Sequence, residues 1–191
     1  MSNNMKPMKK IKGIYTLLFL LLLTVSSFAQ QDSIAMQREA RSLLRDGNEL
    51  YQQEKFTDAS VLYKKALEKN ATYKKASYNL GNALYLQKDY KEAVPQFELS
   101  AKAAKDKFSK AESFHNIGNS MMEQKQYQQA VDAYKDALRN NPNDDETRYN
   151  LAVAKKKLKE QKDKEKKDQK DNKDKKDNKD KKDNKDKNDD K

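Results

Sequence analysis

The chain has 191 residues, a length that suits a single domain, but 37% of them are charged and none is cysteine. Disulfide bonds and thiolate metal sites are therefore excluded. The formal net charge of +11 lies mainly at the two ends, because residues 1–29 carry four lysines and no acid, and residues 155–191 carry 18 lysines against 12 acidic residues. The nearly neutral middle argues against nucleic-acid binding, which needs a clustered basic face.

Residues 1–29 have the order of a secretory signal peptide. Four lysines flank the start of an apolar run of twelve residues, 14–25, and Ser27 and Ala29 are small residues before a cut ahead of Gln30. An uncleaved membrane anchor is the alternative, although twelve apolar residues are fewer than the ~20 that span a bilayer. No cysteine follows the run, which excludes a lipoprotein anchor. The sequence therefore predicts export with cleavage.

Three stretches of the middle region resemble one another. Their glycines, Gly47, Gly81 and Gly118, are separated by 34 and then 37 residues, so about three residues are inserted near 108–110. Each stretch predicts two helices joined by a turn, and we place the units at 40–73, 74–107 and 111–144. Residues 145–162 begin like a fourth unit without a second helix and are expected to cap the array. Ser33 suits an N-cap, so we expect the first helix to start there.

Small and aromatic residues recur at matching positions of the three units. A glycine inside a helix costs about 0.5–1 kcal/mol, so its recurrence predicts a close helix–helix approach with no room for a side chain. Small residues recur twelve residues after each glycine (Ala59, Ala93, Ala130) and nineteen after it (Ala66, Ser100, Ala137), and aromatic residues sixteen after it (Tyr63, Phe97, Tyr134). We expect the aromatic side chains to fill the gaps between closely packed helices.

This pattern is typical of the tetratricopeptide repeat (TPR), and the middle region is identified as a member of that family. The resemblance implies an all-α solenoid of three helix-turn-helix repeats plus a C-terminal capping helix, in a domain that covers residues 33–162. Two features depart from the family pattern. The closing proline is present only as Pro142, and the tryptophan common in the first helix is replaced by Leu43, Ser77 and Phe114.

Residues 163–191 form a low-complexity tail rich in lysine and aspartate. Leu158 is the last apolar residue, so the tail has nothing to bury against the cost of ordering, and we expect it to be disordered. A solvated spacer is one interpretation. The other interpretation is that the tail binds a ligand: the lysines would contact anionic lipid or cell wall, or the aspartates would weakly bind a divalent cation. The interspersed charges of opposite sign weaken both kinds of binding.

No catalytic motif is evident in the sequence. The chain has one histidine, His115, and neither a glycine-rich phosphate loop nor a nucleophile or metalloprotease motif. His115 falls at the fifth position of a first helix, where a groove residue with local hydrogen bonds is the simpler interpretation. The sequence therefore predicts a protein that is not an enzyme and that has no cofactor and no metal site.

The inner groove of the predicted solenoid is lined by asparagine and aromatic side chains. Matching positions of the first helices share one face, and an asparagine amide both donates and accepts hydrogen bonds, so such a row can hold a peptide backbone of any sequence. The alternative is that the asparagines pack neighbouring repeats together. The candidate peptide-binding residues are Asn48, Tyr78, Asn79, Asn82, Tyr85, His115, Asn116, Asn119 and Met122.

One subclass of these repeats clamps C-terminal carboxylates with lysine and arginine beside such asparagines. Asn48 and Asn79 match that pattern, but Leu44, Glu112 and Asn116 stand where the subclass has cations. Because Glu112 would repel a carboxylate, we expect no carboxylate clamp.

The layout of the whole chain narrows the resemblance. The signal segment ending FAQ, the stretch SYNLGNALYLQKDYKEAVPQFE and the ending NPNDDETRYNLAVAKKKLKE are similar to the TPR component of the Bat (aerotolerance) operons of Bacteroidetes-type bacteria. The resemblance implies a periplasmic adaptor for membrane-anchored von Willebrand-type partners, linked to stress or oxygen tolerance.

The expected partner is thus a protein or peptide of the cell envelope. Nucleic acid is not expected, membrane contact is expected only indirectly or through the tail, and the sequence does not fix the oligomeric state. The alternative is an envelope-surface protein whose lysine-rich tail binds anionic lipid or cell wall.

Overall fold

The computed structural model describes residue 15 and residues 31–186, with side chains described as far as residue 169. The predicted signal peptide, apart from Tyr15, lies outside the described residues. After a helix over residues 31–52 come α2 (Phe56–Lys69), α3 (Lys74–Leu86), α4 (Tyr90–Ala103), α5 (Lys107–Glu123), α6 (Tyr127–Asn140) and α7 (Asp145–Asp186).

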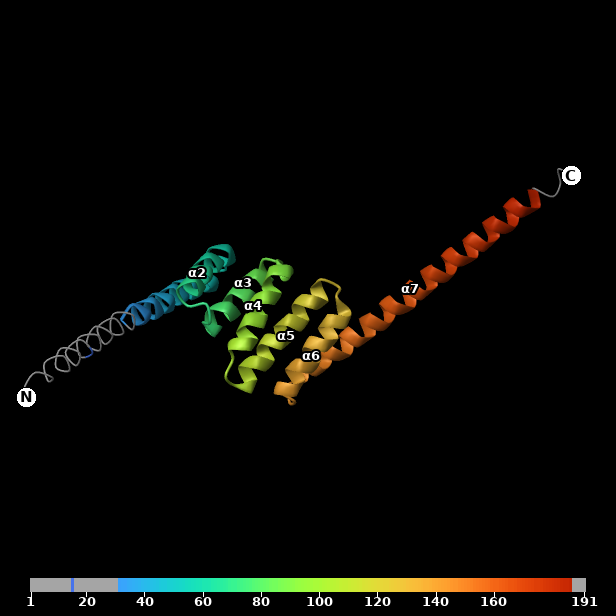
Figure 1. Cartoon of the computed structure of the whole chain (residues 1–191). Coiled ribbons are helices and arrows are strands. Elements are labelled where there is room, and N and C mark those ends of the chain that lie inside the picture. The colour runs from blue at the N-terminus through green and yellow to red at the C-terminus, as the bar shows by residue number, and fades with distance from the viewer. Residues whose placement is uncertain (1–14, 16–30, 187–191) are drawn as a thin grey trace, which may run out of the picture.

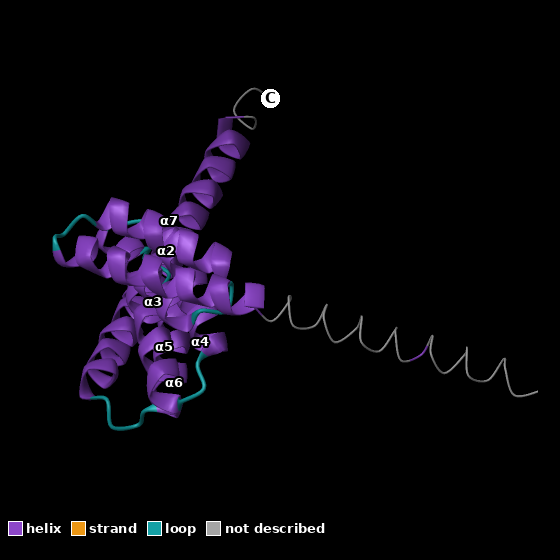
Figure 2. Cartoon of the chain, turned by 90° about the vertical axis from the view of Figure 1, so that its left-hand side faces the viewer, coloured by secondary structure: helices purple, strands orange, loops and turns teal. Residues whose placement is uncertain are grey.

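Helices that follow one another in the chain pack side by side. From α2 to α7 each helix contacts the next, and α5 also contacts α7, so the array is a solenoid of helical hairpins (Figure 1). Only helices and loops occur among the described residues (Figure 2). The all-α TPR-like solenoid predicted from the repeats is confirmed.

The first helix begins earlier than predicted. Gln31 and Asp32 are already helical, so Ser33 lies inside the helix and does not cap it. Gln31 and Asp32 are neither glycine nor proline, the residues that most often interrupt a helix, so the helix can include them. The first buried residue of this helix is Ala40, so its contribution to the core starts where the first repeat was placed.

The recurring glycines lie beneath aromatic rings of the second helix of their own repeat. A β-carbon at these positions would lie 2.4–2.6 Å from the nearest ring atom, closer than side chains pack. The three rings are at most 1% exposed, so they have little room to move aside. The predicted close approach is confirmed, and it is between a helix backbone and a ring. The pairs are Gly47–Tyr63, Gly81–Phe97 and Gly118–Tyr134.

The other recurring small residues are buried as expected. Each is at most 1% exposed: Ala59, Ala93 and Ala130 near the start of the second helices, and Ala66, Ser100 and Ala137 one turn beyond the rings. The Ser100 hydroxyl accepts a hydrogen bond from the Ser113 hydroxyl at 3.0 Å, which joins α4 to the following repeat.

The turn inside each repeat uses the left-handed backbone conformation at matching positions. Glu54, Lys88 and Lys125 have φ values of 58°, 62° and 59°. A left-handed conformation is unfavourable for residues with a β-carbon, so these turns carry a small local strain. An aromatic pair closes two of the turns, with ring centroids 5.2 Å apart for Tyr51–Phe56 and 5.1 Å apart for Tyr85–Tyr90.

The insertion in the third repeat lengthens a helix and not a loop. α5 has 17 residues where α3 has 13, and it begins at Lys107, before the predicted start of the repeat at residue 111. The Asp106 carboxylate caps it by accepting a hydrogen bond from the Ser109 backbone N–H at 2.7 Å. The inserted residues are therefore absorbed as an extra helical turn.

The start of α7 closes the solenoid. Its inner side buries Thr147 and Ala154 completely, and Asp144 caps it by accepting hydrogen bonds from the Thr147 backbone and hydroxyl. Lys155 stands 34 residues after Met121, where the preceding repeats have an apolar side chain. Because a lysine keeps its charge in water, this position solvates the end of the array, as a capping helix requires.

Part of the predicted tail belongs to α7, and the disorder expected over residues 163–191 stays a prediction. α7 continues without a break to Asp186, and residues 187–191 lie outside the described residues. The sequence from 145 onwards contains no glycine or proline to end a helix, and local pairs such as Gln161–Glu165 support it without any core contact. Among the described helices, none is both long and apolar enough to cross a membrane.

Candidate functional site

The five predicted groove asparagines, together with Asn150 of the capping helix, are hydrogen-bonded in pairs between neighbouring repeats. In each pair, the side-chain amide of the later repeat donates to the amide oxygen of the earlier one, and all six side chains are partly exposed. The pairs are Asn79 to Asn48 at 2.7 Å, Asn116 to Asn82 at 3.1 Å and Asn150 to Asn119 at 3.3 Å.

Buried tyrosines hold two of the accepting asparagines from below. The Tyr63 hydroxyl donates to Asn48 Oδ1 at 2.9 Å, and the Tyr134 hydroxyl donates to Asn119 Oδ1 at 2.7 Å. Burial, reinforced by the nearby Tyr51, raises the pKa of Tyr63 to about 12. Burial also raises the pKa of Tyr134, so both hydroxyls stay protonated and remain donors at neutral pH.

The middle repeat lacks the hydrogen bond from a buried tyrosine to the accepting asparagine. Phe97 stands where the other repeats have the tyrosine and has no hydroxyl to donate. Asn116 here reaches both Asn82 Oδ1 and, at 3.2 Å, the hydroxyl of Tyr78. Tyr78 is thereby fixed on the groove face of α3.

The structure therefore gives the asparagines the packing role that was the alternative to peptide binding. Their oxygens join one repeat to the next, while the side chains remain partly exposed on the same face. A packed and partly exposed amide retains hydrogen-bonding capacity toward a ligand. Direct contact with a peptide remains a prediction for these residues.

Four cavities follow one another along this face. Their volumes are about 180, 190, 400 and 180 Å³, and each shares lining residues with the next. Asn79 links the first to the second, Tyr78 and Glu112 link the second to the third, and Asn119 links the third to the fourth. All nine predicted groove residues line at least one of them. We call this continuous depression the groove.

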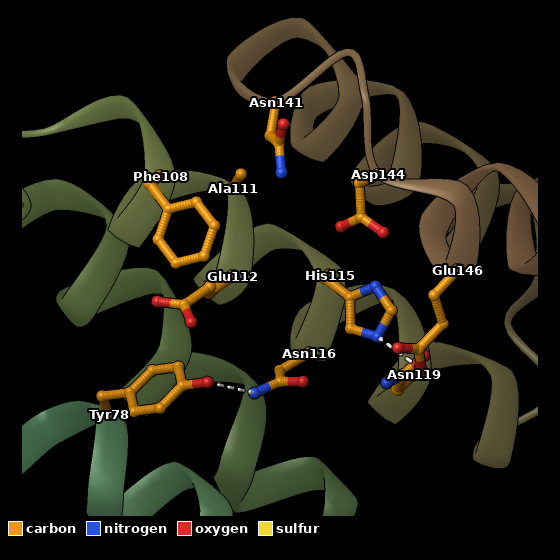
Figure 3. Close-up of a pocket in the computed structure, with 10 residues that line it drawn as sticks. All are labelled: Tyr78, Phe108, Ala111, Glu112, His115, Asn116, Asn119, Asn141, Asp144 and Glu146. Carbon is orange, nitrogen blue, oxygen red and sulfur yellow. Dashed lines mark hydrogen bonds and ion pairs between the residues drawn. The ribbon is translucent and has the colours of Figure 1, made fainter.

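The largest of these four cavities lies between α5 and the start of α7. Figure 3 shows Phe108 and Glu112 on one side and Asp144 and Glu146 on the other, with His115 between them. Phe108 is 62% exposed. Burial raises the pKa of Glu112, an effect that the nearby Lys74 partly opposes.

Six residues that line this cavity were absent from the predicted groove, among them Phe108, Asp144 and Glu146. Phe108 lies in the inserted turn, and Asp144 precedes the capping helix. Of these three, Glu146 alone had a signal, since it follows Glu112 by 34 residues and so occupies the matching position of the cap.

His115 belongs to a hydrogen-bonded chain that ties α5 to α7. The Thr147 hydroxyl donates to Asp144 Oδ2 at 2.7 Å, so its oxygen accepts from His115 Nδ1 at 2.6 Å. The other ring nitrogen, Nε2, faces the Glu146 carboxylate at 3.5 Å. Burial alone would raise the pKa of Asp144, but the Thr147 hydrogen bonds and the nearby His115 lower it. These contacts fix the ring and agree with the local role expected for it.

The site offers hydrogen bonds, apolar contacts and charge to a ligand. Over the residues that the structure describes, no group of three or more His, Asp or Glu side chains could hold a metal ion. The arrangement is suited to holding an extended or helical segment against the first helices of the repeats.

Comparisons with known proteins agree with the fold. A tetratricopeptide-repeat family model matches residues 74–143, and a TPR repeat model matches residues 47–88. No curated protein sequence matches the chain. The matched repeats and the shared architecture support a tetratricopeptide-repeat protein. Domains of this family are generally protein–protein interaction scaffolds, which present a concave surface to a partner.

Solved structures of the same fold cover close to two thirds of this chain. The first TPR domain of Spaghetti (RPAP3), bound to the HSP90 peptide SRMEEVD, is 19% identical with a TM-score of 0.59, covering 64% of this chain and 94% of that one. The N-terminal domain of stress-induced protein-1 from C. elegans is 23% identical, with a TM-score of 0.59 and coverages of 63% and 98%. YrrB, described as a TPR protein with an unusual peptide-binding site, is 25% identical, with a TM-score of 0.54 and coverages of 65% and 63%.

Proposed function

We propose that the chain is a non-enzymatic scaffold that holds a segment of a partner protein in the groove. One observation carries this proposal: the nine residues expected to face a peptide line a single depression of four linked cavities. Pockets of several hundred cubic ångströms with a few convergent polar groups are typical of binding sites. The peptide complex named for Spaghetti (RPAP3) supports the same use of the fold.

We further propose that the scaffold works in the periplasm as an adaptor for membrane-anchored Bat-type partners with von Willebrand-type domains, linked to stress or oxygen tolerance. The signal-like order of residues 1–29 supports export. The partner class rests on the sequence resemblance of the repeats and their ending to the TPR component of Bat operons.

The partner segment need not end in a carboxylate. Glu112 lines two of the linked cavities at a position where carboxylate-clamping repeats have a cation. A carboxylate placed beside Glu112 would meet a like charge. We therefore propose that the groove takes an internal segment of its partner.

The test is the affinity of the soluble domain of a von Willebrand-type protein encoded beside this chain's gene, measured by isothermal titration calorimetry. Asn79→Trp fills the groove and should weaken binding at least about tenfold, the loss that a central interface residue causes. Lys91→Trp adds the same ring on α4, where Lys91 is exposed and outside the four cavities, and should leave binding unchanged. Equal affinities for both variants would reject the groove as the binding surface, provided circular dichroism shows both folded.

A second candidate function uses the tail. α7 extends well beyond the repeats (Figure 1), and its described side chains from Lys159 to residue 169 are all exposed and rich in lysine. Such a helix could attach the protein to anionic lipid or cell wall. Salt-sensitive sedimentation with phosphatidylglycerol vesicles that disappears when residues 163–191 are removed would favour this function, whereas unchanged sedimentation would exclude the tail.

A further inference from the structure

One position of the repeat changes charge along the groove. The second residue of each repeat, and of the capping helix, is Arg41, then Lys75, then Glu112 and finally Glu146, separated by 34, 37 and 34 residues. The last three of these residues line the groove. Because they occupy matching positions of stacked repeats, the four side chains lie on one face of the solenoid, and all four residues are exposed. The face is therefore cationic over the first two repeats and anionic over the third repeat and the cap.

The cationic half has one neighbouring lysine that is already paired and one arginine that is exposed. Lys74 lines the same cavity as Lys75, but it forms an ion pair with Asp106 Oδ2 at 3.3 Å and donates to Ser109 Oγ at 2.8 Å, so its charge is balanced within the chain. Arg45 occupies the position at which the later repeats have the groove asparagines, and it is exposed.

The anionic half coincides with the largest cavity. Its volume of about 400 Å³ is lined by Glu112, Asp144 and Glu146, and by no lysine or arginine among the described residues. Asp144 is occupied in capping α7, and Glu146 faces His115. The Glu112 carboxylate makes no hydrogen bond or ion pair within the described part of the chain, so it is available to a ligand.

Phe108 supplies the apolar complement to these charges. Its ring lines the cavity opposite Asp144, as Figure 3 shows. The residue is 62% exposed. Lysine and arginine combine a long apolar stem with a cationic end, and both bind favourably against aromatic rings. A ring beside an unpaired carboxylate in a cavity of this size fits such a side chain better than an acidic or purely apolar one.

We propose that the groove binds a charge-bipartite partner segment, which places a lysine or arginine side chain in the α5–α7 cavity and acidic residues over the first two repeats. This inference rests on the proposed function and names the chemistry of its partner. The opposite placement would set like charges against each other at both ends, so the charge pattern also fixes the orientation of the segment.

The test starts from random peptides of about 12 residues, which span roughly 40 Å when extended, selected for binding to the full chain. The expected peptides carry Lys or Arg toward one end and Asp or Glu toward the other. Fluorescence anisotropy then compares Glu112→Lys with Glu98→Lys, an equal charge change on an exposed residue of α4 outside the cavities. Glu112→Lys should weaken binding at least about tenfold at low salt, and Glu98→Lys less than about twofold.

The outcomes distinguish a failure of the bipartite inference from a failure of the groove as the binding site. Peptides that lose binding in Asn79→Trp but show no charge blocks, or bind Glu112→Lys as well as the unaltered chain, would overturn the bipartite inference and leave the groove as the binding site. Peptides that bind equally well to Asn79→Trp would reject the groove itself, and the inference with it. Selected peptides that are uniformly acidic or uniformly basic would also overturn the inference.

Discussion

Replacing the glycine beneath a buried ring with alanine is predicted to destabilise the protein, the opposite of the usual effect in a helix. Replacing a glycine with alanine inside a helix ordinarily stabilises it by about 0.5–1 kcal/mol. At Gly81, however, the new β-carbon would lie 2.6, 2.8 and 2.9 Å from three atoms of the Phe97 ring. An ordinary contact begins at 3.4 Å, so the ring would have to move by roughly 0.8 Å, although Phe97 is only 1% exposed.

Overpacking of this kind costs about 1–3 kcal/mol, which outweighs the gain in helix propensity. We expect Gly81→Ala to lower the free energy of unfolding by about 1–2 kcal/mol, measured by urea denaturation followed by circular dichroism. The matched control is Ala152→Gly, because Ala152 occupies the glycine position of the capping helix, where no second helix follows and the residue is exposed. This change should cost only about 1 kcal/mol, the ordinary propensity difference.

Combining Gly81→Ala with Phe97→Leu tests the cause. Removing the ring should relieve the clash, so the two changes together should cost at least about 0.5 kcal/mol less than the sum of their separate effects. If Gly81→Ala alone stabilised the protein, the ring would not be held against the helix backbone, and our explanation of the repeat would be refuted.

Three further changes test local features of the fold. Pro95 is the exposed sixth residue of α4 and has no backbone N–H to donate to the Lys91 carbonyl. Pro95→Ala should therefore raise the free energy of unfolding by about 1–2 kcal/mol. A fall in the free energy of unfolding would show that the proline fits this helix. Lys88→Gly should raise the free energy of unfolding by up to about 1 kcal/mol, because glycine adopts the left-handed φ of 62° without strain. Its control, Glu98→Gly in the middle of α4, should lower the free energy of unfolding by a similar amount. The hydrogen bond from the Ser109 backbone lowers the pKa of Asp106 from 3.8 to about 2, so its stabilisation is complete above about pH 4 and is lost as the pH falls toward 2. The loss of melting temperature in Asp106→Ala should therefore be largest at neutral pH and shrink below pH 4, and a loss that grows on acidification would contradict the cap.

The repeat and its packing could be predicted because each recurring residue type has a local reason. Gly47, Gly81 and Gly118 recur with the rings that cover them, so three copies of the same pattern fix which helices approach closely. The groove residues followed from that register. The start of α5 did not follow from the repeat spacing, because an insertion counted along a sequence does not show whether it enters a loop or extends a helix. The cap formed by Asp106 places the inserted residues in the helix.

Side-chain pairing could not be read from the sequence. The Asn79–Asn48 hydrogen bond joins residues of different repeats, and its formation depends on how closely the two helices stack. The cavity beside Glu112 has the same origin, since Asp144 and Glu146 reach it from the capping helix. The disorder expected of the tail from its lack of apolar residues stays a prediction. α7 continues over part of the tail, where the sequence contains no helix breaker and side chains such as Gln161 and Glu165 pair locally.

The measurement that tests the central claim most directly is the map of amide chemical-shift changes when a selected partner segment binds the labelled protein. Binding in the groove predicts that the changes concentrate on the first helices of the repeats, at Asn79, Glu112 and Asn116 and at the start of α7. Changes confined to α2, α4 and α6, with these groove residues unaffected, would contradict it.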